Sequence, residues 1–300
     1  MRDTRFRINL MGLQLKTDKI CLITGATKGL GEVLACRFWA AGYSLCLIAR
    51  SHVGLERVKA ALPQAQQQVC ITLVCDLSDL AAVDFLTKSL SDELPRLDVL
   101  INNAALHGPI GPAWINNLLE WREAFHVDFL APVALCQMAV TLMQTSGGGS
   151  IINLSGGGAT GPRPNFTAYG SAKSALVRFS ETLAEETLNI GIRVNSIAPG
   201  AMKTTMLGEV LERGAQASGQ REFDIAQKVF VEGGASMERV ADLALFLASD
   251  ASNGITGKLI SAVWDKWEEW PGHLEELNTS DIYTLRRITG RDRGMDWGDK

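Results

Sequence analysis

The sequence lacks the marks of several large protein classes. No apolar run approaches the roughly 20 residues that span a bilayer, and the first residues have no apolar core of a secretory signal. The net charge is only −4, so nothing in the charge balance suggests nucleic acid or an anionic membrane as a partner. We therefore expect a cytoplasmic protein that binds a small molecule and neither a membrane nor nucleic acid.

Metal-ligand patterns are missing too. The four histidines have no ligand spacing, and the cysteines include no C-x-x-C pair. All six cysteines lie in the first half of the chain: Cys21, Cys36, Cys46, Cys70, Cys75 and Cys136. Several fall inside apolar runs, which predicts reduced, buried thiols and no metal site.

Short apolar runs alternate with longer segments of helical periodicity. The runs are 20–24, 44–49, 69–75, 97–102, 150–154, 193–198 and 258–262. The helical segments are 30–41, 53–61, 79–93, 117–144, 167–189 and 236–248, the last with Ser236 as its N-cap. Continuous apolar strands between helices predict a Rossmann-type, doubly wound parallel β-sheet of the α/β class.

No linker divides the chain, so we expect a single domain over residues 18–263. A short basic arm at residues 1–17 precedes it, with Met11 as an alternative start. A tryptophan-rich extension at 264–300 follows it. Residues 201–235 and the tail are expected to be irregular.

The first predicted strand runs into a glycine-rich turn and then a helix. The turn comprises Thr24, Gly25, Ala26, Thr27, Lys28, Gly29, Leu30 and Gly31. Such a turn lets the backbone approach a pyrophosphate and aims a helix N-terminus at its charge. The alternative is a tight turn that holds no ligand.

The end of the second predicted strand indicates which dinucleotide binds. A protein that binds NAD usually places an acid there to hold the ribose 2′-hydroxyl, but this strand ends in Arg50 and Ser51. Arg50, with Lys28 of the glycine turn, is suited to grip a 2′-phosphate. The pattern predicts NADP(H) in preference to NAD(H), unless both cations are merely solvated.

Tyr169 and Lys173 lie four residues apart at the start of a helical segment, which places them on one helix face. A nearby ammonium favours the phenolate, so the tyrosine pKa is expected to fall and the hydroxyl to act as a general acid or base. The alternative is a buried tyrosine beside a surface lysine.

Together these motifs resemble the classical short-chain dehydrogenase/reductase family, over residues 18 to about 260. The matching segments are Thr24–Gly31, Cys75–Leu77, Asn102–Ala105, Tyr169–Lys173, Arg193–Asn195, and Pro199–Gly200 followed by Thr204. The resemblance implies that Asp76 and Leu77 lie in the cofactor site, Asp76 at the adenine, and that Asn103 and Ala104 line it. It also implies that Tyr169 is the general acid/base, that Lys173 holds the nicotinamide ribose, and that Pro199, Gly200 and Thr204 close over the nicotinamide.

Two positions depart from the family pattern. Gly156 stands where the family has its catalytic serine, and strand alternation would turn the adjacent Ser155 to the other face unless the following loop shifts. Asp128 stands where the family has an asparagine, but Pro132 has no N–H, so the Asp128 carbonyl that anchors a water in the family stays bare. We expect Asp128→Asn to be almost silent and Gly156→Ser to fit. The candidate catalytic residues are therefore Tyr169, Lys173, Ser155 and Asp128.

Weaker signals surround this site. His107 could supply the missing hydrogen bond, and Arg163 and Asn165 could touch substrate, or all three are ordinary loop residues. Trp264, Trp267 and Trp270 suit a pocket for a hydroxyl-rich ligand such as a sugar derivative, or equally a subunit interface in a homodimer or homotetramer.

The function predicted from these observations is NADP(H)-dependent interconversion of a carbonyl and an alcohol by hydride transfer. Because the usual serine is missing, two alternatives stay open. One is a net non-redox reaction, as in an epimerase. The other is a degenerate nucleotide-binding subunit or sensor.

Overall fold

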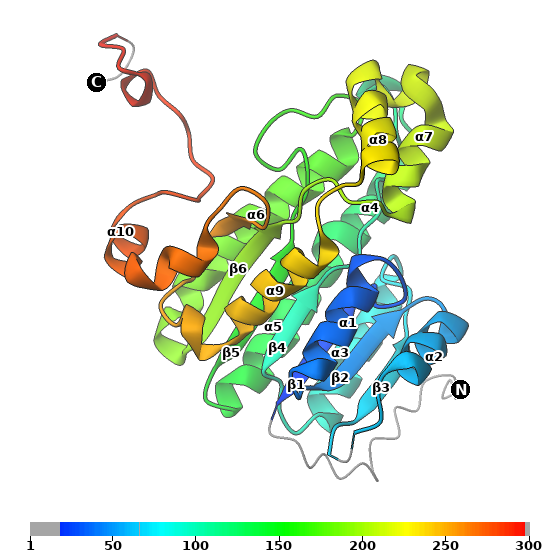
Figure 1. Ribbon diagram of the computed structural model, residues 1–300, viewed down its shortest axis with the longest axis vertical. Helices are drawn as coiled ribbons and strands as arrows, with labels where there is room; N and C mark the ends of the chain where they lie inside the picture. The colour runs from blue at the N-terminus through cyan, green and yellow to red at the C-terminus, as the bar shows by residue number, and fades with distance from the viewer. Residues whose placement is uncertain (1–18, 66, 298–300) are drawn as a thin grey trace.

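A computed structural model describes residues 19–65 and 67–297, so the predicted arm at 1–17 lies outside the described residues. Its centre is a seven-stranded parallel sheet in the order β3-β2-β1-β4-β5-β6-β7 (Figure 1). The strands are β1 (Ile20–Thr24), β2 (Ser44–Ala49), β3 (Cys70–Val74), β4 (Val99–Asn102), β5 (Gly149–Leu154), β6 (Ile192–Ala198) and β7 (Leu259–Ser261). This confirms the predicted doubly wound α/β fold.

Helices cover both faces of the sheet (Figure 1). They are α1 (Leu30–Ala40), α2 (His52–Ala61), α3 (Leu80–Glu93), α4 (Leu118–Phe125), α5 (Ala131–Thr145), α6 (Thr167–Thr187), α7 (Thr205–Ser218), α8 (Gln220–Glu232), α9 (Met237–Ala248) and α10 (Leu274–Thr279). Side chains of β1 alternate between the two cores: Cys21 and Ile23 pack with α1, α2 and α9, whereas Ile20 and Leu22 pack with α3 and α5. Both faces of β1 are therefore buried, as its apolar run predicts.

The predicted helix at 117–144 is interrupted. Between α4 and α5 the chain forms a π-helical segment, η3 (His126–Leu130), just before Pro132. A proline has no N–H to complete the α-helical ladder, and the wider π turn accommodates that loss. The whole stretch Leu118–Thr145 is long and apolar enough to cross a membrane, although no single apolar run suggested it. This is weak evidence for a span, because half of the tested window is buried, as it would be in a core helix.

The expectation of an irregular segment at 201–235 is wrong, since the segment contains α7 and α8. Glycines obscure the helical pattern there. Gly214 has a left-handed backbone inside α7, with φ of 72°, and Gly219, with φ of 86°, ends α7 and starts α8. The two helices pack on each other at the top of the molecule in Figure 1.

The structure confirms that the cysteines are buried, with the exception of Cys36. All six cysteines lie in the described part of the chain as free thiols, five of them buried and Cys36 exposed. Burial raises the pKa of the Cys136 thiol to about 12, so this thiol is protonated and unreactive.

None of the described tail residues lines the pocket at the strand ends, so the pocket alternative for the tail tryptophans finds no support there. After β7 the chain forms η6 (Trp267–Gly272) and α10, and it packs on the α9 side of the sheet. The ring of Trp267 lies 5.2 Å from that of Phe246, and the ring of Trp270 lies 4.4 Å from that of Tyr283. Both tryptophans are 5% exposed in the main apolar core. Trp264 is 84% exposed, so of the three tryptophans it is the one that could still contact a second subunit.

Candidate active site

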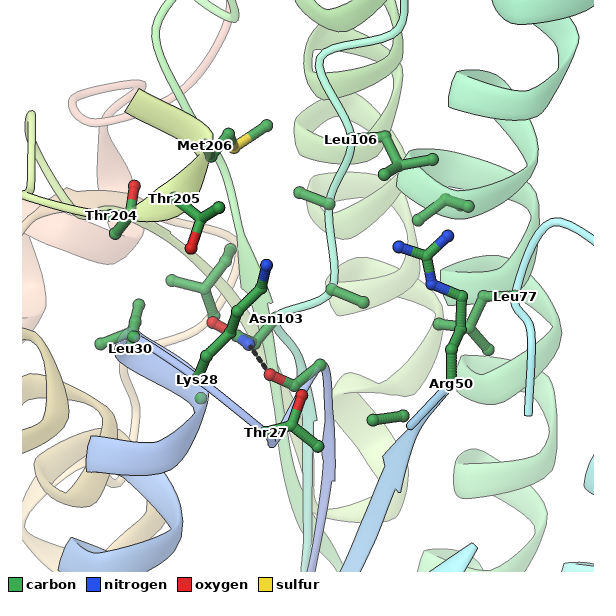
Figure 2. Close-up of a pocket in the computed structure, with 18 of the residues that line it drawn as sticks. Thr27, Lys28, Leu30, Arg50, Leu77, Asn103, Leu106, Thr204, Thr205 and Met206 are labelled. Carbon is green, nitrogen blue, oxygen red and sulfur yellow. Dashed lines mark hydrogen bonds between the residues drawn. The ribbon is translucent and has the colours of Figure 1, made fainter. Parts of the chain in front are cut away.

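The strands of the sheet end at a pocket of about 550 Å³ (Figure 2). The glycine turn after β1 and the ends of β2, β3, β4 and β5 contribute its walls. Figure 2 shows Thr204, Thr205 and Met206, at the start of α7, on one side and Arg50 and Leu77 on the other. This is the crevice where ligands bind in open α/β sheets.

The glycine turn is closely packed, and Gly25 and Gly31 have no room for a side chain. Gly25 and Gly29 have left-handed backbones, with φ of 67° and 55°. A Cβ on Gly31 would lie 2.2 Å from the carbonyl oxygen of Gly25. Helix α1 starts at Leu30, and no side chain of the described residues caps it. Its first N–H groups are therefore free to bind an anion such as a pyrophosphate.

A second anchor ties this turn to the end of β4. The Thr24 hydroxyl accepts hydrogen bonds from the backbone N–H groups of Asn103 (3.0 Å) and Ala104 (3.1 Å). The Asn103 amide in turn donates to the carbonyl of Thr24 at 2.9 Å. These bonds fix the two loops that face the pocket. Thr24 itself is buried behind the wall and, unlike Asn103 and Ala104, does not line the pocket.

The charges at the β2 end agree with the prediction from sequence. Lys28, Arg50 and Ser51 line the pocket there, and Figure 2 shows Lys28 and Arg50 on opposite sides of Thr27. Of the described residues that line the pocket, Asp76 carries the only carboxyl group. One oxygen of Asp76 accepts hydrogen bonds from the backbone and hydroxyl of Ser78, so it orders the turn after β3. Among the described lining residues, no acid stands where a 2′-hydroxyl would be held.

Most of the predicted cofactor residues line this one pocket. Besides Thr24, the exception is Gly200, which has φ of 81° and packs toward Val263 and Ala235. The pattern from sequence missed several wall residues that carry no motif: Ile48, Ala49, Gly54, Leu106, Val127, Leu154, Met202, Thr205 and Met206. Their positions at strand ends and at the start of α7 are the signal that could have identified them.

Tyr169 and Lys173 line the same pocket. Both lie in the first turns of α6 and are buried, with 7% and 1% of their surfaces exposed. The Lys173 ammonium donates to the carbonyl of Leu154 at 3.0 Å and lies 5.7 Å from the centre of the Tyr169 ring. The alternative of a surface lysine is therefore wrong.

The expected fall in the tyrosine pKa is not what the structure shows. Burial raises the pKa of Tyr169, the Asp128 carboxyl raises it further, and the Arg163 guanidinium opposes both. Burial also lowers the pKa of Lys173, with Asp128 opposing it. The Lys173 ammonium donates to the carbonyl of Leu154. Lys173 is the nearest cation in the sequence, but because of this bond it is not the group that favours the Tyr169 phenolate.

Asp128 is fully buried in η3. One of its oxygens accepts a hydrogen bond from the backbone N–H of Leu106 at 2.8 Å, and the other has no partner among the described residues. Burial raises the pKa of Asp128 to about 6, against the lowering effects of Lys173 and of the Leu106 N–H. The side chain is therefore electrically coupled to both Lys173 and Tyr169, a role beyond the one expected of its backbone carbonyl.

The missing serine leaves a space that Tyr169 fills. A Cβ on Gly156 would lie 2.0 Å from the Tyr169 hydroxyl oxygen, so a serine here needs the Tyr169 side chain to move. Ser155 lines the pocket, because β5 ends at Leu154 and strand alternation no longer applies. Its hydroxyl is buried and has no partner among the described residues. Ser155 is thus an available hydroxyl near Tyr169.

Helices α7 and α8 cover the catalytic end. Phe166 and Tyr169 pack against Val210 of α7 and Ala226 of α8. His107 Nδ1 lies 3.3 Å from a carboxylate oxygen of Glu209 on α7, and its ring meets the Tyr169 ring edge-on at 5.4 Å. Burial lowers the pKa of His107, with Glu209 opposing.

A second ion pair joins the cover to the loop before α6. Arg163 Nε donates to Glu222 of α8 at 2.8 Å. Asn165, the other loop residue that was expected to touch substrate, has a left-handed backbone with φ of 68° and packs near Gly219.

These observations fit a dinucleotide. The pocket joins an anion cradle, two cations at the β2 end and a buried Tyr–Lys pair. Fold and site together define a dinucleotide-binding oxidoreductase of the Rossmann type.

Comparison with known proteins identifies the family. A family described as enoyl-(acyl carrier protein) reductase matches residues 25–262. The chain is 30% identical over 246 residues to the short-chain dehydrogenase/reductase astE of Aspergillus oryzae, covering 81% of this chain and 92% of that protein. It is 30% identical over 241 residues to meso-2,3-butanediol dehydrogenase of Serratia marcescens, covering 80% and 91%. The chain belongs to the short-chain dehydrogenase/reductase family, whose members use NAD(P).

Solved structures agree with this assignment. The crystal structure of YwfH, an NADPH-dependent reductase involved in bacilysin biosynthesis, superposes with a TM-score of 0.72 at 27% identity, covering 81% of this chain and 96% of that one. NAD⁺-bound xylitol dehydrogenase also superposes with a TM-score of 0.72, over 82% and 98%, but its 24% identity shows the fold alone. Relatives of this fold thus include users of either dinucleotide.

Proposed function

We propose that this protein interconverts a carbonyl and an alcohol with NADP(H) as the hydride carrier and Tyr169 as the general acid/base. One observation carries the proposal. The same pocket is lined by the glycine cradle and Arg50 and by the buried pair of Tyr169 and Lys173. A dinucleotide and a reacting carbonyl would therefore meet in one crevice.

The cofactor supplies the hydride chemistry when it is bound. The glycine turn and the N-terminus of α1 would hold its pyrophosphate. Lys28 and Arg50 would hold the 2′-phosphate, with the Ser51 hydroxyl at the same edge. Lys173 would lie beside the nicotinamide ribose. Asp76, Asn103, Ala104, Pro199 and Thr204 line the remaining length of the site.

Tyr169 would exchange a proton with the substrate oxygen. In the direction of reduction, its hydroxyl donates to the developing alkoxide; in the direction of oxidation, the phenolate accepts the alcohol proton. Burial raises the pKa of Tyr169, which disfavours the phenolate that the oxidation step needs. The unpaired Ser155 hydroxyl is a donor for the substrate carbonyl in place of the missing serine.

The walls beside Tyr169 support a small, mostly apolar substrate. Leu106, Met202 and Met206 line the pocket, of which Met206 packs with the cluster that contains Tyr169, and Ser155 provides a polar group. We propose a ketone or secondary alcohol, which agrees in kind with the diol in the name of the Serratia relative. A hydroxyl-rich sugar derivative is the second candidate substrate. It has less support, because Trp267 and Trp270, which were expected to bind it, are buried in the core.

The test is a panel of ketones, diols and sugar derivatives, followed by the change in absorbance of NADPH and of NADH. We expect turnover with NADPH, and Tyr169→Phe should abolish it while leaving cofactor affinity near that of the wild type. Product without net change in cofactor would favour an epimerase-like reaction instead. Tight NADPH binding with no product from any member would favour a sensor or subunit.

Two broader proposals accompany this function. We propose a homodimer or homotetramer, with the exposed Trp264 as a contact, and a cytoplasmic location in which the free thiols stay reduced. The division between a domain at 18–263 and an extension at 264–300 stays a prediction. The burial of Trp267 and Trp270 argues that the first part of the extension folds with the domain.

A further inference from the structure

Three consecutive glycines after β5 make room for two side chains. A Cβ on Gly156 would meet the Tyr169 hydroxyl. A Cβ on Gly157 would lie 3.7 Å from Arg163 Cδ, and a Cβ on Gly158 would lie 3.2 Å from Arg163 Cβ. The loop that lacks the family's serine is therefore wrapped around Tyr169 and Arg163 together.

Arg163 stacks on Phe166 and lies near the ring of Tyr169. Its guanidinium carbon lies 3.9 Å from the centre of the Phe166 ring and 5.7 Å from the centre of the Tyr169 ring. Its side chain is only 13% exposed, and Nε donates to Glu222 at 2.8 Å. Stacking, burial and an ion pair thus fix a positive charge at the distance where it acts on a phenol.

Other charged groups face Tyr169 from every side. The carboxyl of Asp128, on η3, raises the pKa of Tyr169. Lys173 lies on α6, and its ammonium donates to the backbone carbonyl of Leu154. His107 lies edge-on and is paired with Glu209 of α7. Glu222 of α8 reaches Tyr169 only through Arg163. Among these described groups, Arg163 and Lys173 are the cations that lie 5.7 Å from the centre of the Tyr169 ring, and Arg163 is the one whose charge is not bound to a backbone carbonyl.

We propose that Arg163 is a positioning residue that favours the ionised form of Tyr169, and that Glu222 limits how much of its charge the tyrosine feels. The proposal rests on the function proposed for Tyr169. The sequence pattern attributes the stabilisation of the Tyr169 phenolate to Lys173. The proposal attributes part of this stabilisation to Arg163, a side chain of the loop before α6. The rival hypothesis is that the Arg163–Glu222 pair only fastens α8 over the pocket.

The pH profile of alcohol oxidation separates the two. The rate of oxidation rises with pH as Tyr169 loses its proton, so removal of a nearby cation should move the profile to higher pH. For Arg163→Gln we expect the midpoint of the pH profile of kcat/KM to rise by on the order of one pH unit. At a fixed pH below the midpoint, this rise lowers kcat/KM about tenfold. Arg163→Lys keeps the charge and should stay near the wild-type profile. Arg221→Gln removes an equal charge from the exposed surface of α8 and is the matched control.

Glu222→Gln provides the opposite arm. It breaks the same ion pair but leaves the Arg163 charge unbalanced, so the profile should move to lower pH. A simple fastening role predicts instead that Arg163→Gln and Glu222→Gln lower kcat or raise KM alike at every pH, with the midpoint unchanged. That result would overturn the proposal. It would also be overturned by a midpoint that moves equally in Arg221→Gln.

A measurement without turnover separates this proposal from the proposed function. The chain has three tyrosines, so the ¹³C signal of a ring-labelled Tyr169 can be assigned by its loss in Tyr169→Phe. At one alkaline pH, the ionised fraction of Tyr169 should fall in Arg163→Gln and rise in Glu222→Gln. If the wild type oxidises no alcohol but these fractions move as expected, the proposed function fails and the electrostatic role of Arg163 stands. Unmoved fractions refute that role even in an active enzyme.

Discussion

The stability of Asp128→Asn relative to the wild type should rise as the pH rises from acid to alkaline values. Burial raises the pKa of this carboxyl from 3.8 to about 6. A raised folded-state pKa means that the native state binds the proton more tightly than the unfolded chain does. The charge therefore costs nothing below pH 3.8, and its full cost is reached only above about pH 6. At about 1.4 kcal/mol per pH unit, the full cost is about 3 kcal/mol.

The amide removes this cost but introduces one of its own. The new side chain in Asp128→Asn would still accept the hydrogen bond from the Leu106 N–H, whereas its NH₂ group would replace the carboxyl oxygen that has no partner in the described chain. An unpaired buried amide costs about 1–3 kcal/mol. That penalty does not depend on pH, so the change in stability between two pH values still reports the charge alone.

The assay is denaturant unfolding of wild type and Asp128→Asn at about pH 5 and about pH 8. The free energy of unfolding of the variant, relative to that of the wild type, should be higher at pH 8 than at pH 5 by about 1–2 kcal/mol. The reason is that roughly half of the cost of the Asp128 charge is already relieved at pH 5. Asp92→Asn removes an exposed carboxyl of α3 and should show no such dependence. A variant that gains nothing between the two pH values would refute the argument that Asp128 is buried as a charge.

Three further substitutions test the pocket and the tail. Arg50→Asp should weaken NADPH binding by about 1.5–3 kcal/mol and narrow the preference over NADH, and equal affinities of the wild type for the two cofactors would contradict the proposed specificity. Gly156→Ser should lower turnover, because its Cβ needs the space of the Tyr169 hydroxyl; increased activity would show that the ring moves aside freely. Trp267→Ala should cost about 3–5 kcal/mol of unfolding free energy and leave KM unchanged. A higher KM with unchanged stability would restore the pocket hypothesis for the tail.

Much of the fold follows from periodicity, and its exceptions have local causes. The apolar runs at β1 and β2 match the strands residue for residue, because strands buried on both faces leave an unbroken signal. Ser236 caps α9 as expected, accepting a hydrogen bond from the Arg239 N–H. Helices α7 and α8 were missed because Gly214 and Gly219 interrupt a pattern that is only weakly buried. Their stability comes from packing on each other and on Phe166, which no local pattern reports.

The candidate site divides in the same way. The glycine turn and the pair of Tyr169 and Lys173 were predictable because contiguous residues build them. The direction in which a side chain points was not. Lys173 turns to the carbonyl of Leu154, which is brought near by β5. The tail tryptophans were placed at the pocket because the end of β7 points there, but η6 folds back over α9.

The two departures from the family pattern act on one atom, the Tyr169 oxygen, in a consistent way. The absence of a side chain at Gly156 lets that oxygen pack against the backbone, where burial disfavours its ionised form. The carboxyl of Asp128 disfavours it further. A cation near this oxygen opposes both effects and so eases loss of the proton. Arg163 lies at that position, in a loop whose glycines leave space for it. The lost serine, the gained carboxyl and the stacked arginine are therefore best understood as parts of one electrostatic balance.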